Sequence, residues 1–238
     1  MKLFSKGNGA LKRAGQLRGV AVVVFSIPAF RSSDGFVVCP LAGKCAEDGA
    51  CYAMRGSYSW PTVKAAQEWR LSLARSEDFE ALAYEELKAL RKQADREGLK
   101  LYVRVHDSGD FFNREYLKAW VSLAYSMPDL TFYSYTKSLS WVRELREAGA
   151  IPENFVVTFS QGGKLDSTID PETEKHSRLF ATVGDLEAAG YLNGTKDDLI
   201  AADADAIKVG LVYHGPKAGA EAWGLPWAGM KAYKEAKA

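Results

Sequence analysis

The three cysteines of the chain, Cys39, Cys45 and Cys51, lie within one stretch of thirteen residues. Five residues separate each cysteine from the next, and a proline and two glycines lie between them. Glycine and proline allow a loop to turn back on itself, so three thiols at this spacing can converge on one point. Such convergence indicates a metal ion or an iron–sulfur cluster bound by a loop over residues 39–51.

Thiolates are soft ligands that select zinc, copper(I) or iron–sulfur clusters. Structural zinc normally takes four protein ligands, and the chain has only three cysteines. Zinc would need a fourth ligand such as His106, His214 or a carboxylate, whereas a [4Fe-4S] cluster held by three cysteines keeps one iron open to a small molecule. The alternative is three thiols with unrelated roles, which their concentration in one loop disfavours.

A second group of chemically able residues is the run His106-Asp-Ser-Gly-Asp110. Imidazole and carboxylate groups transfer protons near neutral pH, so His106, Asp107 and Asp110 are candidate catalytic residues. Ser108 and Gly109 between them are candidate cofactor-binding residues. The alternative is that Asp107 or Asp110 caps a helix that starts near Asn113.

Further polar residues follow the later predicted strands. Lys137 ends the run Tyr133-Ser-Tyr-Thr-Lys137, and Ser160 and Gln161 end the next strand. His214 follows the last one. These four residues are candidate cofactor contacts, although a hydrogen-bonded structural histidine is an equal alternative for His214.

Composition limits the class of protein. With 31 basic and 30 acidic residues among 238, the net charge of +1 gives no support for nucleic-acid binding. Three clustered cysteines do not resemble a disulfide framework, which favours a reducing, cytoplasmic setting. The apolar run Val20–Ile27 is too short to span a membrane, so no membrane association is expected. The sequence leaves the oligomeric state open.

The remaining pattern alternates strands with helices. Leu99–Val105 alternates strictly, which places Arg104 and His106 on a polar face. Residues 1–18 show no sustained period and are expected to be irregular. The predicted strands are Gly19–Ile27, Leu99–Val105, Leu130–Tyr135, Phe155–Ser160, Arg178–Val183 and Ile207–His214. The predicted helices cover residues 61–75, 77–97, 113–126, 139–148, 185–190, 196–203 and 231–238.

Six βα units favour a parallel sheet, either open and doubly wound or curled into a partial barrel. The polar positions on the inner faces of the strands favour the barrel. We therefore predict one α/β domain over residues 1–238, a partial (β/α)6 TIM-like barrel with mainly parallel strands. Ligands of such folds bind at the carboxyl ends of the strands, and the cysteine loop follows the first strand.

The chain resembles the phage "gene product eighty-eight" family, whose members are small phage-encoded proteins of poorly assigned function. The resemblance covers about residues 20–214 and is carried by the pairing of Cys51-Tyr-Ala53 with His106-Asp-Ser-Gly-Asp110. It implies host-cell cytoplasm as the location. The other stretches that carry it are Phe25-Ser-Ile-Pro28, Cys39-Pro40, Cys45, Val103–Val105 and Phe132–Lys137.

That family in turn resembles the radical S-adenosylmethionine (SAM) enzymes, whose partial barrel carries three cysteines after its first strand. The resemblance implies a [4Fe-4S] cluster at Cys39, Cys45 and Cys51, with Ser108-Gly109-Asp110 where the superfamily holds the SAM amino group. The common spacing in that superfamily is C-x3-C-x2-C, which differs from the spacing here. The resemblance therefore supports a cluster more strongly than it supports SAM binding. We expect an iron–sulfur protein with one open iron, either redox-active or radical-SAM-like. The alternatives are a zinc-dependent hydrolase and a non-enzymatic phage interaction protein with a structural metal site.

Overall fold

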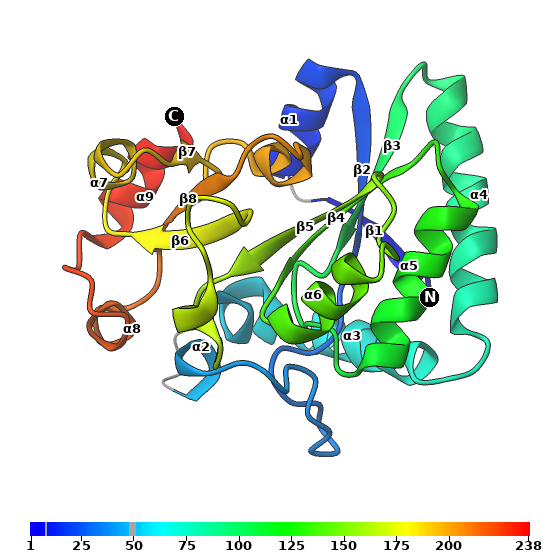
Figure 1. Cartoon of the computed structure of the whole chain (residues 1–238), viewed down its shortest axis with the longest axis horizontal. Helices are drawn as coiled ribbons and strands as arrows, with labels where there is room; N and C mark the ends of the chain where they lie inside the picture. Colours follow the sequence, from blue (N-terminus) through cyan, green and yellow to red (C-terminus); the bar gives the residue numbers. More distant parts are fainter. Residues whose placement is uncertain (8, 48–50) are drawn as a thin grey trace.

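One eight-stranded sheet forms the centre of the protein (Figure 1). The computed structural model describes residues 1–7, 9–47 and 51–238. The strand order is β1-β2-β3-β4-β5-β6-β8-β7, and every neighbouring pair is parallel except β1 with β2. The strands are β1 (Phe4–Lys6), β2 (Val20–Phe25), β3 (Lys100–Val105), β4 (Thr131–Thr136), β5 (Phe155–Ser160), β6 (His176–Phe180), β7 (Leu192–Asn193) and β8 (Lys208–Val212).

Helices follow most of the parallel strands and complete the βα rhythm. The α-helices are α1 (Gly9–Arg18), α2 (Lys44–Glu47), α3 (Pro61–Ala74), α4 (Phe79–Arg96), α5 (Arg114–Ser126), α6 (Leu139–Glu147), α7 (Val183–Ala188), α8 (Lys217–Ala222) and α9 (Gly229–Lys237). The 3-10 helices are η1 (Tyr52–Met54), η2 (Gly56–Ser59), η3 (Asp166–Thr168) and η4 (Asp198–Ala202). The prediction of a mainly parallel α/β sheet is confirmed, since its six strands correspond to β2, β3, β4, β5, β6 and β8.

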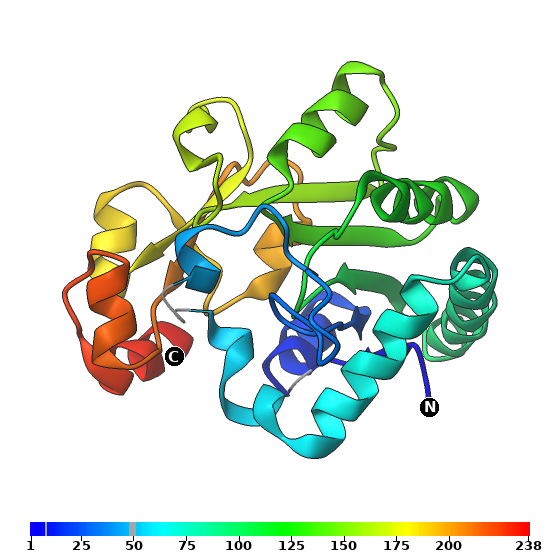
Figure 2. The same ribbon diagram turned by 90° about the horizontal axis from the view of Figure 1, so that it is seen from below.

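The sheet buries apolar side chains on both faces. On one face, Phe25, Val103 and Phe132 pack with residues of α4 and α5, such as Leu87 and Trp120; Figure 2 shows these two helices side by side. On the other face a smaller cluster joins α1, the sheet and η4 through their apolar side chains. Its members are Leu11, Val20, Val22, Val24, Tyr133, Val156, Leu199 and Ala201.

The expectation of an irregular N-terminal segment is wrong for the described residues. β1 pairs with β2, with Phe4 opposite Phe25, and α1 places Leu11 against the sheet. Glycines conceal this helix in the sequence, but Gly15 is needed, because a Cβ there would lie 2.6 Å from the Val20 carbonyl oxygen. Asn8 lies outside the described residues.

The sheet has two edges within the described part of the chain. β1 pairs only with β2, and β7 pairs only with β8, so no pairing joins the two ends. The structure thus shows a mixed α/β sheet without barrel closure. No helix of the described residues is long and apolar enough to cross a membrane.

Candidate functional site

All three cysteines line one cavity of about 340 Å³, which we call the first cavity. Its lining includes Asp107, Lys137, Ser160 and His214, which lie at or just after the carboxyl ends of β3, β4, β5 and β8. Figure 1 shows α2 and the neighbouring loop below the sheet; Figure 2 gives the view from below. A second cavity of about 340 Å³ adjoins it and shares Cys45, Cys51, Lys137 and Ser160. Residues 48–50 of the predicted cysteine loop lie outside the described residues.

The cysteine loop is held against the loop that follows β5. The backbone N–H groups of Gly43 and Cys45 donate to the Gly162 carbonyl at 3.0 and 3.2 Å. The turn at Gly162 is held by Asp166, whose carboxylate oxygens accept hydrogen bonds from the Gly162 and Gly163 N–H groups at 2.6 and 2.8 Å. The end of β5 therefore positions Cys45.

Cys39 is positioned by a turn after β2. Its Sγ accepts a hydrogen bond from the Phe30 N–H at 3.4 Å, and its own N–H donates to the Phe30 carbonyl. Phe30 has a φ of 60°, so the chain reverses there in a conformation that L-residues seldom adopt. Burial raises the pKa of the Cys39 thiol, which keeps it protonated when no metal is bound.

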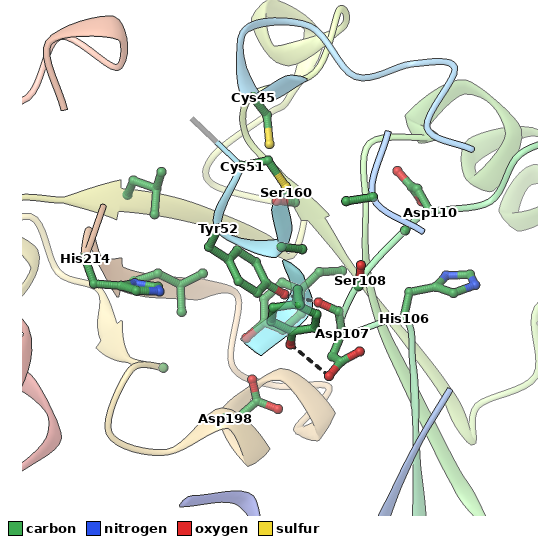
Figure 3. Close-up of a pocket in the computed structure, with 18 of the residues that line it drawn as sticks. Cys45, Cys51, Tyr52, His106, Asp107, Ser108, Asp110, Ser160, Asp198 and His214 are labelled. Carbon is green, nitrogen blue, oxygen red and sulfur yellow. Dashed lines mark hydrogen bonds between the residues drawn. The ribbon is translucent and has the colours of Figure 1, made fainter. Parts of the chain in front are cut away.

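Cys45 and Cys51 form a pair of unequal thiols. A hydrogen bond from Cys51 lowers the pKa of Cys45 to about 6, and the same bond raises the pKa of Cys51. Figure 3 shows the two side chains beside each other, above Ser160. The hydrogen bond therefore favours the thiolate form of Cys45, which is the form that binds metals.

Lys137 supplies the opposing positive charge. Its Nζ donates to Ser160 Oγ at 3.1 Å. Loss of solvent lowers the pKa of Lys137, but the thiolates and Asp110 more than offset this, so the pKa lies above its usual value. The structure thus brings the predicted residues Lys137 and Ser160 to the cysteines.

Asp110 connects β3 to β4 rather than capping a helix. Its Oδ1 accepts from Thr136 Oγ1 at 2.5 Å and from the Phe111 N–H at 2.8 Å, and its Oδ2 accepts from the Lys137 N–H at 2.8 Å. Burial raises the pKa of Asp110, against the effect of these hydrogen bonds. The cap of α5 is Asn113, which accepts from the Tyr116 N–H at 2.8 Å.

Asp107 joins the two sequence motifs. Its Oδ2 accepts from Tyr58 Oη at 2.9 Å, its Oδ1 accepts from Ser26 Oγ, and its carbonyl accepts from Tyr52 Oη (Figure 3). Tyr52 directly follows Cys51. The Cys-Tyr-Ala and His-Asp-Ser-Gly-Asp stretches are therefore in contact at the cavity.

His106 lies at the edge of the cavity with its ring turned away from it (Figure 3). Its φ of 69° breaks the alternation of β3 and places the ring among Phe25, Phe111 and Trp120. Nε2 hydrogen-bonds Tyr116 Oη at 2.8 Å, and burial lowers the pKa of His106 to about 3. A neutral, packed imidazole fits a structural role.

The other predicted residues line the cavities in different ways. Ser108 is buried, and its Oγ has no hydrogen-bond partner among the described residues. Gly109 has a φ of 87° and touches Ile27, where any Cβ would collide. His214 stacks on Tyr233 with ring centroids 4.3 Å apart, at the side of the first cavity opposite His106, and Gln161 lines the second cavity.

Sequence reasoning missed a half-buried ion pair in the first cavity. Arg104 Nη1 lies 3.1 Å from Asp198 Oδ1, and Asp198 Oδ2 accepts from Tyr133 Oη at 2.9 Å. Strand alternation indicated Arg104, but Asp198 begins η4, far along the chain, and had no signal beyond an acidic pair near a predicted helix. Burial raises the pKa of Asp198, and the charge of Arg104 opposes that rise.

The cysteines do not form the close grouping that a single metal ion requires. Among the described residues, no three His, Cys, Asp or Glu side chains are near enough to one another to hold one ion. The three thiols instead line the cavity wall, and all are free of disulfides.

A model of the family described as Gene product 88 matches residues 2–228. This match confirms the resemblance to that family predicted from the motifs. Neither the curated proteins nor the solved structures include a match to this chain.

Proposed function

This chain belongs to the gene product 88 family, and we propose that it is an iron–sulfur protein in which Cys39, Cys45 and Cys51 bind one [4Fe-4S] cluster. One observation carries the proposal: three free thiols from a single loop line one cavity beside the half-buried cation Lys137. Thiolates are the usual protein ligands of such clusters.

The donor set fits this group. A cluster distributes its sulfur ligands over several iron atoms, so they stand farther apart than the ligands of one zinc ion, where tetrahedral geometry sets about 3.8 Å between sulfurs. The hydrogen bond from Cys51 lowers the pKa of Cys45, and the positive charge of Lys137 favours the ionised form of the thiols. The cavity also leaves room for a small molecule.

When bound, a cluster of this kind supplies electron transfer and one iron that can coordinate a small molecule. Asp110 holds the Lys137 backbone, Ser160 holds its ammonium group, and Tyr52 ties the cysteine loop to Asp107. Ser108 places a buried hydroxyl group in the wall of the first cavity, where a small molecule could bind.

Six consecutive parallel strands, with the cysteines after the first, support a radical-SAM-like arrangement in the form of a partial barrel. We place a non-SAM role ahead of SAM chemistry, because the cysteine spacing differs from the common pattern of that superfamily. A cluster of this kind and free thiols fit a cytoplasmic protein.

Metal and sulfide analysis of anaerobically purified protein tests the proposal. We expect brown protein with iron and acid-labile sulfide, and a loss of both on Cys→Ser substitution at all three positions. The control is Ser59→Ala, which removes an exposed hydroxyl in η2, just after the cysteine loop. This variant should stay brown. Colourless protein with one zinc and no sulfide would contradict the proposal and support the zinc hydrolase. Calorimetric titration with SAM then separates the SAM and non-SAM roles.

A further inference from the structure

Basic side chains predominate over carboxylates in the lining of the second cavity. Its lining includes three cations, Arg55, Lys137 and Arg178, together with His214. No Asp or Glu of the described residues lines it. The first cavity differs, because Asp107, Asp110 and Asp198 lie in its wall among the basic residues.

Arg178 is the exposed cation of this lining. Its guanidinium lies over the Phe180 ring, 5.3 Å from the ring centroid. In the part of the chain that the structure describes, Arg178 forms no ion pair with a carboxylate. Its charge is therefore available to a ligand that enters the cavity.

Arg55 approaches the cavity through a gap that two glycines create. A Cβ at Gly215 would lie 2.9 Å from Arg55 Nη1, and one at Gly219 would lie 3.6 Å from it. The same Cβ atoms would collide with Tyr213 Oη. The absence of side chains at both positions therefore makes room for the guanidinium and the phenol.

Trp223 adds a hydrogen-bond donor to the same wall. Its Nε1 is buried and has no hydrogen-bond partner within residues 1–7, 9–47 and 51–238. Its ring lies against Gly162, whose φ of 102° and missing Cβ allow the close approach beside Cys45. A buried N–H without an acceptor costs free energy that a bound oxygen atom would recover.

The negative charges of Asp110 and the ionised thiols offset the positive charge of Lys137, which raises its pKa. Arg178 is farther from that balance, because no carboxylate of the described residues lines the second cavity beside it. Guanidinium groups bind phosphate and carboxylate oxygens in pairs of hydrogen bonds.

We propose that the second cavity binds the anionic group of a small molecule, a phosphate or a carboxylate, at Arg178 and the Trp223 N–H. The adjoining first cavity receives the rest of that molecule beside the cysteines. That the ligand reaches an open iron rests on the proposed function. The anion site itself does not depend on it.

Calorimetric titration of the anaerobically purified full chain with pyrophosphate and with citrate tests the anion site. We expect one binding site whose affinity falls with salt, and a loss of about tenfold or more in affinity in Arg178→Gln. Arg178→Lys keeps the charge and should recover part of the affinity. Arg31→Gln is the matched control, because Arg31 is also exposed, lies over Phe30 at 5.0 Å and does not line either cavity.

Tighter binding of pyrophosphate would indicate a phosphorylated ligand, and tighter binding of citrate a carboxylate; either result supports the site. No heat with either anion, or equal losses in Arg178→Gln and Arg31→Gln, would overturn it. Iron analysis of the same samples separates the two proposals. Colourless protein that binds pyrophosphate would support the anion site and contradict the cluster. Brown protein that binds neither anion would support the cluster and contradict the anion site.

Discussion

Lys137 illustrates how a single residue can serve both the fold and the site. Its backbone N–H is bound by Asp110, so its position follows from the β3–β4 connection. Its ammonium group donates to Ser160 and is not paired with Asp110 through a hydrogen bond in the described structure. The positive charge is consequently left facing the thiols, where it favours their ionised form.

His106 shows the opposite case, in which a chemically able residue is committed to packing. Its ring is 3% exposed and lies among four aromatic side chains, and one nitrogen is bound to Tyr116 Oη. Burial disfavours the imidazolium, which places the pKa of His106 near 3 against an ordinary value of 6.5.

We therefore expect His106 to make the protein sensitive to acid. Between pH 6.5 and 3 the unfolded chain binds a proton that the folded chain does not, so the free energy of unfolding falls as the pH falls. The slope reaches at most about 1.4 kcal/mol per pH unit. Urea denaturation from pH 7 to pH 4 should give a flatter profile for His106→Phe than for the wild type.

Tyr116→Phe is the control for this experiment. It removes the hydrogen bond to His106 but keeps the imidazole and the ring packing, so the steep acid limb should remain. Equal slopes for His106→Phe and the wild type would show that His106 is not buried in its neutral form, and would return it to the list of candidate proton-transfer groups.

At the scale of the elements, the connection after β5 determines where Cys45 lies. Gly162 accepts two backbone hydrogen bonds from the cysteine loop and leaves space for the Trp223 ring. A methyl group at Gly162 would collide with that ring and lie 2.9 Å from the Cys45 Cβ.

Gly162→Ala should accordingly lower metal content while the sheet remains folded. The positive φ alone costs about 1–2 kcal/mol for an alanine, and the collision displaces Trp223 or the cysteine loop. Iron analysis and thermal unfolding measure the two effects. Gly190→Ala is the matched control: Gly190 has a φ of 76° but faces open space, so only the stability should fall. Equal iron content in both variants would contradict the proposed anchoring.

Much of the element pattern could be predicted from the sequence, because periodicity reports which side chains are buried. The predicted helix over 139–148 is observed at Leu139–Glu147, and all six parallel strands were found. The buried face of α3 is harder to predict: Val63 and Trp69 are apolar but only half-buried, whereas Gln67 and Leu71 are buried. Two adjacent stripes of that helix are similarly apolar, so spacing alone could not choose between them.

The candidate site was predictable where a residue directly follows a strand, as Lys137 does, or where residues of one type cluster in the sequence, as the cysteines do. The orientation of His106 was not, because alternation along β3 assumes extended backbone and the chain adopts a positive φ there. Asp198 and Trp223 reach the cavities from segments far along the chain. Only tertiary packing brings them to the cysteines.

On the scale of the whole molecule, the sheet and the cysteine loop depend on different interactions. The larger core lies between the sheet and helices α4 and α5 and includes fully buried residues such as Trp120 and Leu87. The cysteine loop is instead joined by a few hydrogen bonds to Gly162, Phe30 and Asp107. Regions with few buried apolar contacts open locally at low free-energy cost.

Removal of the proposed cluster should therefore loosen one part of the chain only. We expect amide hydrogen exchange to become about tenfold faster or more in peptides from 39–47 and 51–60 after chelation, which corresponds to about 1.4 kcal/mol of local stability. Peptides from β3, β4 and α5 should be unchanged, because their protection comes from the larger core. Mass spectrometry of the loaded and stripped protein makes the comparison. Faster exchange throughout the sheet would mean that the bound group supports the entire fold, and unchanged exchange in the cysteine loop would mean that no group binds there.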